Sequence, residues 1–137
     1  MKKLLTGSLL PIIFLAAILI AGCKKEDPST APILTTSAVS SIQASYAKCG
    51  GAISSIGGEA ITAQGVCVSK LANPTTSDIK IADASGSRSF AVLMTNLSEG
   101  TTYHARAFAT NSVGTSYGED VVFTTSVTPF PDRKSVV

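Results

Sequence analysis

The stretch of sequence that decides the fold is residues 97–110, which read LSEGTTYHARAFAT. A turn containing Gly100 is followed by a run in which side chains alternate with a period of two, which is typical of a β-strand with one buried face. We therefore predict a strand over Thr102–Thr110. Its inward face is predicted to be Tyr103, Ala105, Ala107 and Ala109, and its outward face His104, Arg106, Phe108 and Thr110.

The chain from Ile33 to about Thr125 repeats β-rich runs separated by turn residues at intervals of roughly 8–12 residues, which favours a sandwich or barrel. No stretch in this part has a helical period. The six other strands are predicted at Leu34–Ser40, Ser45–Ile53, Thr62–Ser69, Ile79–Ala82, Ser89–Thr95 and Tyr117–Thr125. The rest of the predicted core is Phe90, Val92, Met94, Val121, Phe123, Leu97, Ile53 and Ile61. This core is thin, rich in alanine and without tryptophan.

The N-terminal segment, residues 1–22, is predicted to be a cleaved lipoprotein signal peptide. Two lysines precede an apolar stretch over Leu9–Ala21, whose 13 residues span about 20 Å as a helix, short of the roughly 30 Å of a bilayer core. A retained transmembrane helix is the alternative. The sequence Ile20-Ala21-Gly22-Cys23 resembles the bacterial lipobox, after which the cysteine carries a diacylglycerol and a further acyl chain. We therefore expect Cys23 to be lipidated and to anchor the chain in a membrane.

Residues 23–32 are predicted to form a lipidated tether, because they contain two prolines and no periodicity. Lys25, Glu26 and Asp27 resemble the export signal that sends some lipoproteins of Gram-negative bacteria to the outer face of the outer membrane. An ordinary solvated charge cluster is the alternative. We expect the protein to be anchored in the outer membrane and to face the cell exterior.

About 115 residues remain after the signal segment, enough for one small domain. From Cys23 onward nine Lys or Arg residues balance nine Asp or Glu residues. Because the chain from Cys23 onward has neither a net charge nor a basic stripe, nucleic acid is not an expected partner. The expected partners are the membrane, through the lipid, and a protein or glycan ligand.

The segment Leu97–Tyr103 matches the tyrosine-corner pattern, in which the tyrosine hydroxyl bonds back to the main chain of the preceding turn. Together with other short motifs, it resembles the fibronectin type III-like domain of bacterial surface lipoproteins. The other motifs are Gly65-Val66-Cys67, Asn73-Pro74-Thr75, Ala105–Asn111, Gly114–Gly118 and Val122–Thr125. The resemblance implies an all-β, immunoglobulin-like sandwich of seven strands over residues 33–126. One departure is Val68, where the family usually has tryptophan.

Two cysteines, Cys49 and Cys67, remain once Cys23 is assigned to the lipid. An even number of cysteines in an oxidising compartment favours a disulfide, which would stabilise the domain by about 3 kcal/mol. Neighbouring glycines at 50, 51 and 65 could bulge the strands and change the face that each cysteine occupies. Unpaired core thiols are therefore the alternative.

No catalytic, metal or cofactor site is predicted. His104 is the only histidine and has no nucleophile motif near it, and the ligand spacing of a zinc site is missing. The strongest candidate for a binding site is the outward face with His104, Arg106 and Phe108, because an exposed aromatic beside a guanidinium can stack on a sugar or a partner side chain. The alternative is cross-strand packing, with Arg106 near Glu119 or Asp120.

The end of the chain, residues 127–137, is expected to be a disordered tail. Its last six residues, 132–137, can be encoded by a widely used sequencing adapter, so we expect the natural protein to continue beyond Pro131. Two functions remain open. The first is a non-catalytic surface module for adhesion, binding or spacing. The second is the N-terminal spacer of a truncated surface enzyme that degrades polysaccharide.

Overall fold

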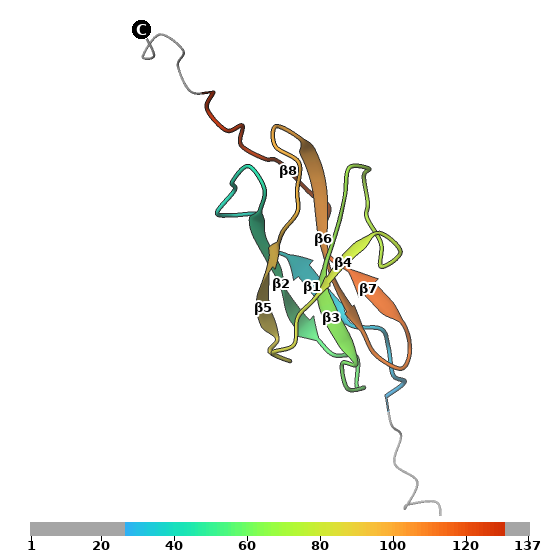
Figure 1. The fold of residues 1–137 in the computed structure, drawn as a ribbon. Coiled ribbons are helices and arrows are strands. Elements are labelled where there is room, and N and C mark those ends of the chain that lie inside the picture. The colour runs from blue at the N-terminus through green and yellow to red at the C-terminus, as the bar shows by residue number, and fades with distance from the viewer. Residues whose placement is uncertain (1–26, 131–137) are drawn as a thin grey trace, which may run out of the picture.

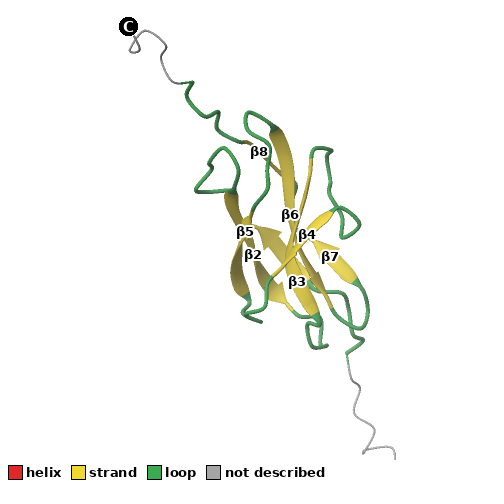
Figure 2. Cartoon of the chain, viewed as in Figure 1, coloured by secondary structure: helices red, strands yellow, loops and turns green. Residues whose placement is uncertain are grey.

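The computed structural model of the chain describes residues 27–130, which form two β-sheets packed face to face (Figure 1). No helix occurs within this range (Figure 2). The strands are β1 (Ile33–Thr36), β2 (Ala47–Ser55), β3 (Ala63–Ser69), β4 (Ile79–Ala82), β5 (Ser89–Met94), β6 (Thr102–Thr110), β7 (Thr115–Tyr117) and β8 (Val121–Thr124). One sheet has the order β1-β2-β5, and the other has the order β4-β3-β6-β7, with β8 also paired to β6. The predicted all-β sandwich is confirmed.

The seven predicted strands become eight because the last one is interrupted. Phe108 pairs with Tyr117, and Ala105 pairs with Val121. Between these two pairs β6 has two residues, whereas the facing chain has three, residues 118–120. One extra residue in one strand of an antiparallel pair is a β-bulge, which bends the chain and redirects its side chains.

The bulge is filled by Thr36 at the end of β1, which crosses here from the other sheet. The amide of Ala107 donates a 3.1 Å hydrogen bond to Oγ1 of Thr36. The amide of Thr36 donates a 2.9 Å bond to the carboxylate of Glu119. The first bond satisfies an amide of β6 that faces the bulge, the second satisfies an amide of the edge strand β1, and together they join the two sheets.

The core lies between the sheets, where the predicted inward face of β6 is buried. Met94 and Val68 are fully enclosed within it. Of the other predicted core residues, Val121 and Ile61 are only partly buried. The core is closed around the small Val68, although the family that the sequence resembles usually has tryptophan at this position.

The tyrosine corner is confirmed. The hydroxyl of Tyr103 accepts a 2.9 Å hydrogen bond from the amide of Ser98, and its ring stacks on Phe123 with centroids 5.8 Å apart. Leu97 is buried beside them in the same core cluster. The corner thus fixes the turn that leads into β6 by one bond to the main chain and by the stacking of Tyr103 on Phe123.

Removing this hydroxyl with Tyr103→Phe is expected to lower the free energy of unfolding by about 1–3 kcal/mol, because the partly buried amide of Ser98 loses its acceptor. Urea denaturation would measure the difference. Tyr46→Phe is the matched control, since Tyr46 lies at the surface. An equal loss in both variants would contradict the assigned role of the corner.

The predicted disulfide is not formed, because Cys49 and Cys67 belong to different layers. Both thiols are free and buried. Cys49 lies in the core between the sheets. Cys67 pairs with Lys80 and Arg106 and shares the outer face of its sheet with them, since its neighbours along β3 point inward. A sheet separates the two sulfur atoms, so the alternative of unpaired thiols holds.

Both thiols are expected to resist labelling in the folded protein. Burial raises the pKa of Cys49, and it raises that of Cys67 to about 11, with a further contribution from Asp78. Since the thiolate is the reactive form, only roughly one Cys67 in a thousand is reactive at pH 8. A disulfide-exchange reagent should label both only after denaturation, and a reductant should leave the intact mass unchanged. A mass change on reduction would show that the pair is bridged.

The chain enters and leaves the sandwich at opposite ends (Figure 1). At the entry end, Thr30 donates its amide to the carbonyl of Gly57 and accepts a 2.7 Å bond from the side-chain amide of Asn111. Ser29 donates to the carboxylate of Glu59. The last part of the predicted tether is therefore bound to the domain and is not a free linker.

At the exit end, Thr128 donates its amide to the carboxylate of Glu99. The domain therefore makes contacts beyond the boundary predicted at residue 126. The predicted signal segment 1–22, Cys23, Lys25, Glu26 and the tail 131–137 lie outside the described residues.

Candidate functional site

The outer face of β6, the predicted binding face, is covered by residues 70–78 between β3 and β4. We call this segment the covering loop. Asn73 donates its amide to the carboxylate of Asp120 at 3.0 Å, and Thr76 donates its amide to the hydroxyl of Tyr117 at 3.2 Å. The carbonyl of Pro74 accepts a 3.4 Å bond from Arg106, and the ring of Pro74 is fully buried. The covering loop is therefore packed onto the outer face.

Phe108 is not an exposed aromatic, so that expectation is wrong. It is on the outward side of β6, as alternation predicts, but only 1% of its surface is accessible. Its direct neighbours across the sheet are Gly65 on β3 and Tyr117 on β7. The ring is a structural element and cannot stack on a ligand.

Arg106 packs across the strands, as the alternative predicted, but among residues 27–130 it forms no ion pair with Glu119 or Asp120. Its guanidinium carbon lies 4.4 Å from the centroid of the Tyr117 ring, which is cation–π geometry. Its Nε donates a 3.1 Å bond to the carbonyl of Gly118 in the bulge. Glu119 is bound to Thr36 instead. The guanidinium of Arg106 therefore stacks on Tyr117 of the same chain and not on a ligand.

His104 pairs with Asp120, the last residue of the bulge. Nδ1 of His104 lies 2.8 Å from Oδ2 of Asp120, and both side chains are about one-fifth exposed. The same oxygen accepts the amide of Asn73. Asp120 therefore links β6 to the covering loop.

The three predicted residues are brought together, but as a structural cluster. Neither the role of Tyr117 as a stacking partner nor the covering loop was predicted from the sequence. The pair Asn73-Pro74 was the available signal, because it marks a sharp turn, but a turn motif does not say over which strand a loop will fold. Within residues 27–130, no group of three potential metal ligands lies close together.

The bulge gives the domain a pH-dependent contact at Glu119. The amide of Thr36 holds the pKa of this carboxyl below its ordinary value of 4.5. A lowered pKa means that the charged form stabilises the fold above the unfolded-state pKa, and that this contribution is lost as the pH falls through the folded-state pKa. Glu119→Gln should therefore unfold more easily than the parent at pH 7, and the difference should shrink as the pH falls below the ordinary value of 4.5. Urea denaturation at pH 7 and at a series of lower pH values tests this, and a difference that does not decrease with pH would contradict it.

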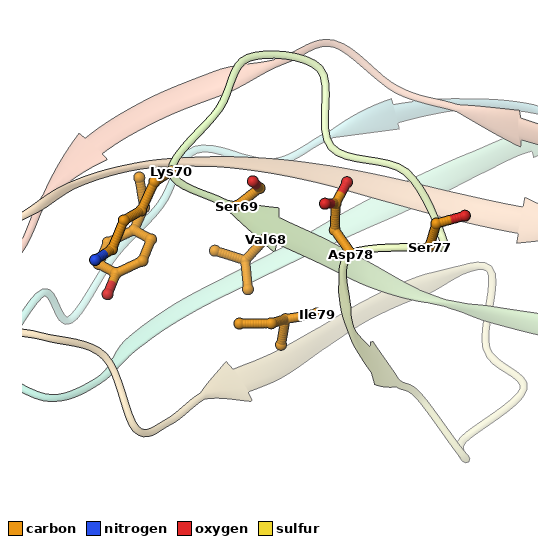
Figure 3. Close-up of a pocket in the computed structure, with 7 residues that line it drawn as sticks. Val68, Ser69, Lys70, Ser77, Asp78 and Ile79 are labelled. Carbon is orange, nitrogen blue, oxygen red and sulfur yellow. The ribbon is translucent and has the colours of Figure 1, made fainter.

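An open groove lies beside the covering loop, at the edge formed by β3 and β4. Its volume is about 610 Å³. Figure 3 shows Ile79 on its floor beside Val68, whose side chain is fully buried, with Lys70 at one side and Ser77 and Asp78 at the other. Ile79 pairs with Val68 on the inner face of the sheet, yet it is 60% exposed. The three-stranded sheet therefore does not cover this corner of the sandwich.

No protein-family model matches the chain, and no curated protein matches it. Solved structures do. The fourth fibronectin type III domain of a human protein is similar with 19% identity and a TM-score of 0.56, covering 81% of this chain and 95% of that one. The third such domain of another human protein has 15% identity and a TM-score of 0.53, covering 81% and 96%. The sensor domain of an anti-sigma factor from Pseudobacteroides cellulosolvens has 13% identity and a TM-score of 0.51, covering 72% and 98%.

At these identities the similarity establishes the fold alone. The described part of the chain is an immunoglobulin-like sandwich of the fibronectin type III kind. Proteins commonly use this fold as a non-catalytic binding or spacer module. No helix among residues 27–130 is long and apolar enough to cross a membrane.

Proposed function

We propose that this chain is a non-catalytic surface module of a bacterial lipoprotein, which binds a partner or spaces one from the membrane. The observation that carries the proposal is the position of its two ends, at opposite poles of the sandwich (Figure 1). In a domain with its two ends at opposite poles, the segment before the domain and the segment after it are separated by the length of the sandwich. The outer face of β6 offers no catalytic arrangement, because His104 and Arg106 are engaged by neighbouring residues.

The anchor is Cys23, on the grounds of the lipobox resemblance. Since Ser29 and Thr30 are bound to the domain, only Cys23–Pro28 is left to act as a tether. Six residues span at most about 20 Å. The pole that carries Gly57 and Asn111 is thus held close to the membrane, and the opposite pole points away from it.

The export signal Lys25, Glu26 and Asp27 supports a place on the outer face of the outer membrane. A protein or a glycan is the proposed class of partner. The geometry of the ends is equally suited to the second function, in which the domain spaces a polysaccharide-degrading enzyme encoded beyond Pro131. Sequencing the gene past this point separates the two: further similar domains support the module, and a new domain with paired carboxylates or a metal motif supports the enzyme.

The anchor is tested by labelling a Gram-negative host with radioactive palmitate. The parent chain and the control Cys49→Ala should both carry the label, and Cys23→Ser should lose it. Protease added to intact cells should degrade the parent, whereas a variant with alanine at Lys25, Glu26 and Asp27 should keep its lipid and be protected. A Cys23→Ser chain that retains the label would overturn the proposed anchor.

A further inference from the structure

We propose that the groove between Lys70 and Asp78 binds an extended peptide segment of a partner protein. An apolar side chain of the peptide would lie on the exposed side chain of Ile79. An acidic side chain of the peptide would face Lys70, and a basic one would face Asp78. This inference deepens the proposed function, because it names the class of partner and the surface that receives it.

The position of the groove suits a partner that approaches from outside the cell. Gly57, which binds the entering chain, precedes β3, whereas Ser69 ends β3 and Lys70 follows it. The seven residues of this strand span about 23 Å. The groove is therefore in the half of the sandwich that points away from the proposed anchor.

The charges at the two sides of the groove are available to a ligand. Within the described part of the chain, Lys70 makes no hydrogen bond or ion pair from its ammonium group. Asp78 uses one carboxylate oxygen to accept the amide of Thr75, and its other oxygen has no partner there. Opposite charges on either side of an apolar floor complement a peptide that carries both charges around an apolar residue.

The floor favours a peptide over a glycan. A sugar is typically held by stacking on an exposed aromatic ring, and the aromatic ring at this groove, Tyr103, is almost completely buried with its hydroxyl bound to Ser98. Ile79 offers an exposed aliphatic surface instead. It lies on β4, an edge strand that pairs on one side only, with β3. The main chain of this free edge can hydrogen-bond an extended peptide.

The test selects phage-displayed random heptapeptides on the full chain in detergent, with removal of phage that bind the variant Lys70→Glu/Ile79→Thr. We expect the enriched peptides to share an apolar residue between an acidic and a basic one. Fluorescein-labelled copies should bind the parent with a dissociation constant that rises about tenfold in Lys70→Glu. A copy whose acidic residue is replaced by lysine should regain affinity for Lys70→Glu.

The matched control is Val122→Thr, an exposed apolar residue on β8, which should leave the dissociation constant unchanged. Thermal unfolding of each variant checks that the fold is kept. Three results would overturn the proposal: no enrichment over the groove variant, groove-dependent binding of soluble polysaccharides alone, or groove-dependent self-association in sedimentation. The palmitate experiment is independent of these results, so failure of the groove would leave the anchor standing.

Discussion

Replacing Phe108 by alanine is expected to lower the free energy of unfolding by about 3–5 kcal/mol. The ring is almost completely buried on the outer face of its sheet, in the region where Arg106 and Tyr117 lie under the covering loop. Truncation removes the transfer free energy of the ring and leaves a cavity in a site that the sheet keeps from collapsing. A small domain is stable by only about 5–15 kcal/mol in total, so this one change should remove a large part of its stability.

Urea denaturation followed by far-ultraviolet circular dichroism would measure the loss. Leu93→Ala is the control, because Leu93 is 47% exposed on β5 and its truncation should cost under about 0.5 kcal/mol. Equal stability of Phe108→Ala and the parent would mean that the ring is at the surface. In that case the outward face of β6 would again be a candidate for ligand binding.

A methyl group at Gly50 is expected to cost about 3 kcal/mol, near the upper end for overpacking. A Cβ built on Gly50 would lie 1.9 Å from the carbonyl oxygen of Phe90 and 2.8 Å from Cα of Ala91. Both atoms are main chain of β5, so no side-chain rotation can relieve the contact. The strands β2 and β5 would have to separate at the centre of the three-stranded sheet.

Gly114→Ala is the matched control, since a Cβ there meets no atom within 4 Å and Gly114 has no positive φ. Its free energy of unfolding should stay close to that of the parent. Hydrogen exchange would locate the damage, with faster exchange of β2 and β5 amides in Gly50→Ala. A Gly50→Ala protein as stable as the parent would show that the two strands lie farther apart than described.

Much of the fold is local and was therefore predictable. The strands Ile79–Ala82 and Thr102–Thr110 were predicted with the same bounds as observed. The inward face of β6 followed from alternation alone, because a strand offers only two faces. The corner at Tyr103 also followed, since its hydroxyl bonds to the amide only five residues earlier.

The wrong expectations all depend on segments that are distant along the chain. The disulfide failed because the sequence shows the spacing of Cys49 and Cys67 but not the layer that each one faces. The last strand was predicted as one piece because the bulge at residues 118–120 is stabilised by Thr36, more than 80 residues away. A period-two pattern carries no information on such a partner.

By itself, the sequence determined the elements of this protein: β-strands, their inward faces, the tyrosine corner and the class of sandwich. Only the tertiary structure decided which outward faces meet water. Phe108 and Cys67 point away from the core as alternation requires, yet both are buried. Periodicity assigns a side chain to one of two faces, whereas its burial depends on what folds over that face. Here the covering loop closes the surface that the sequence offered as a binding face, and it leaves open the groove beside Lys70 and Ile79.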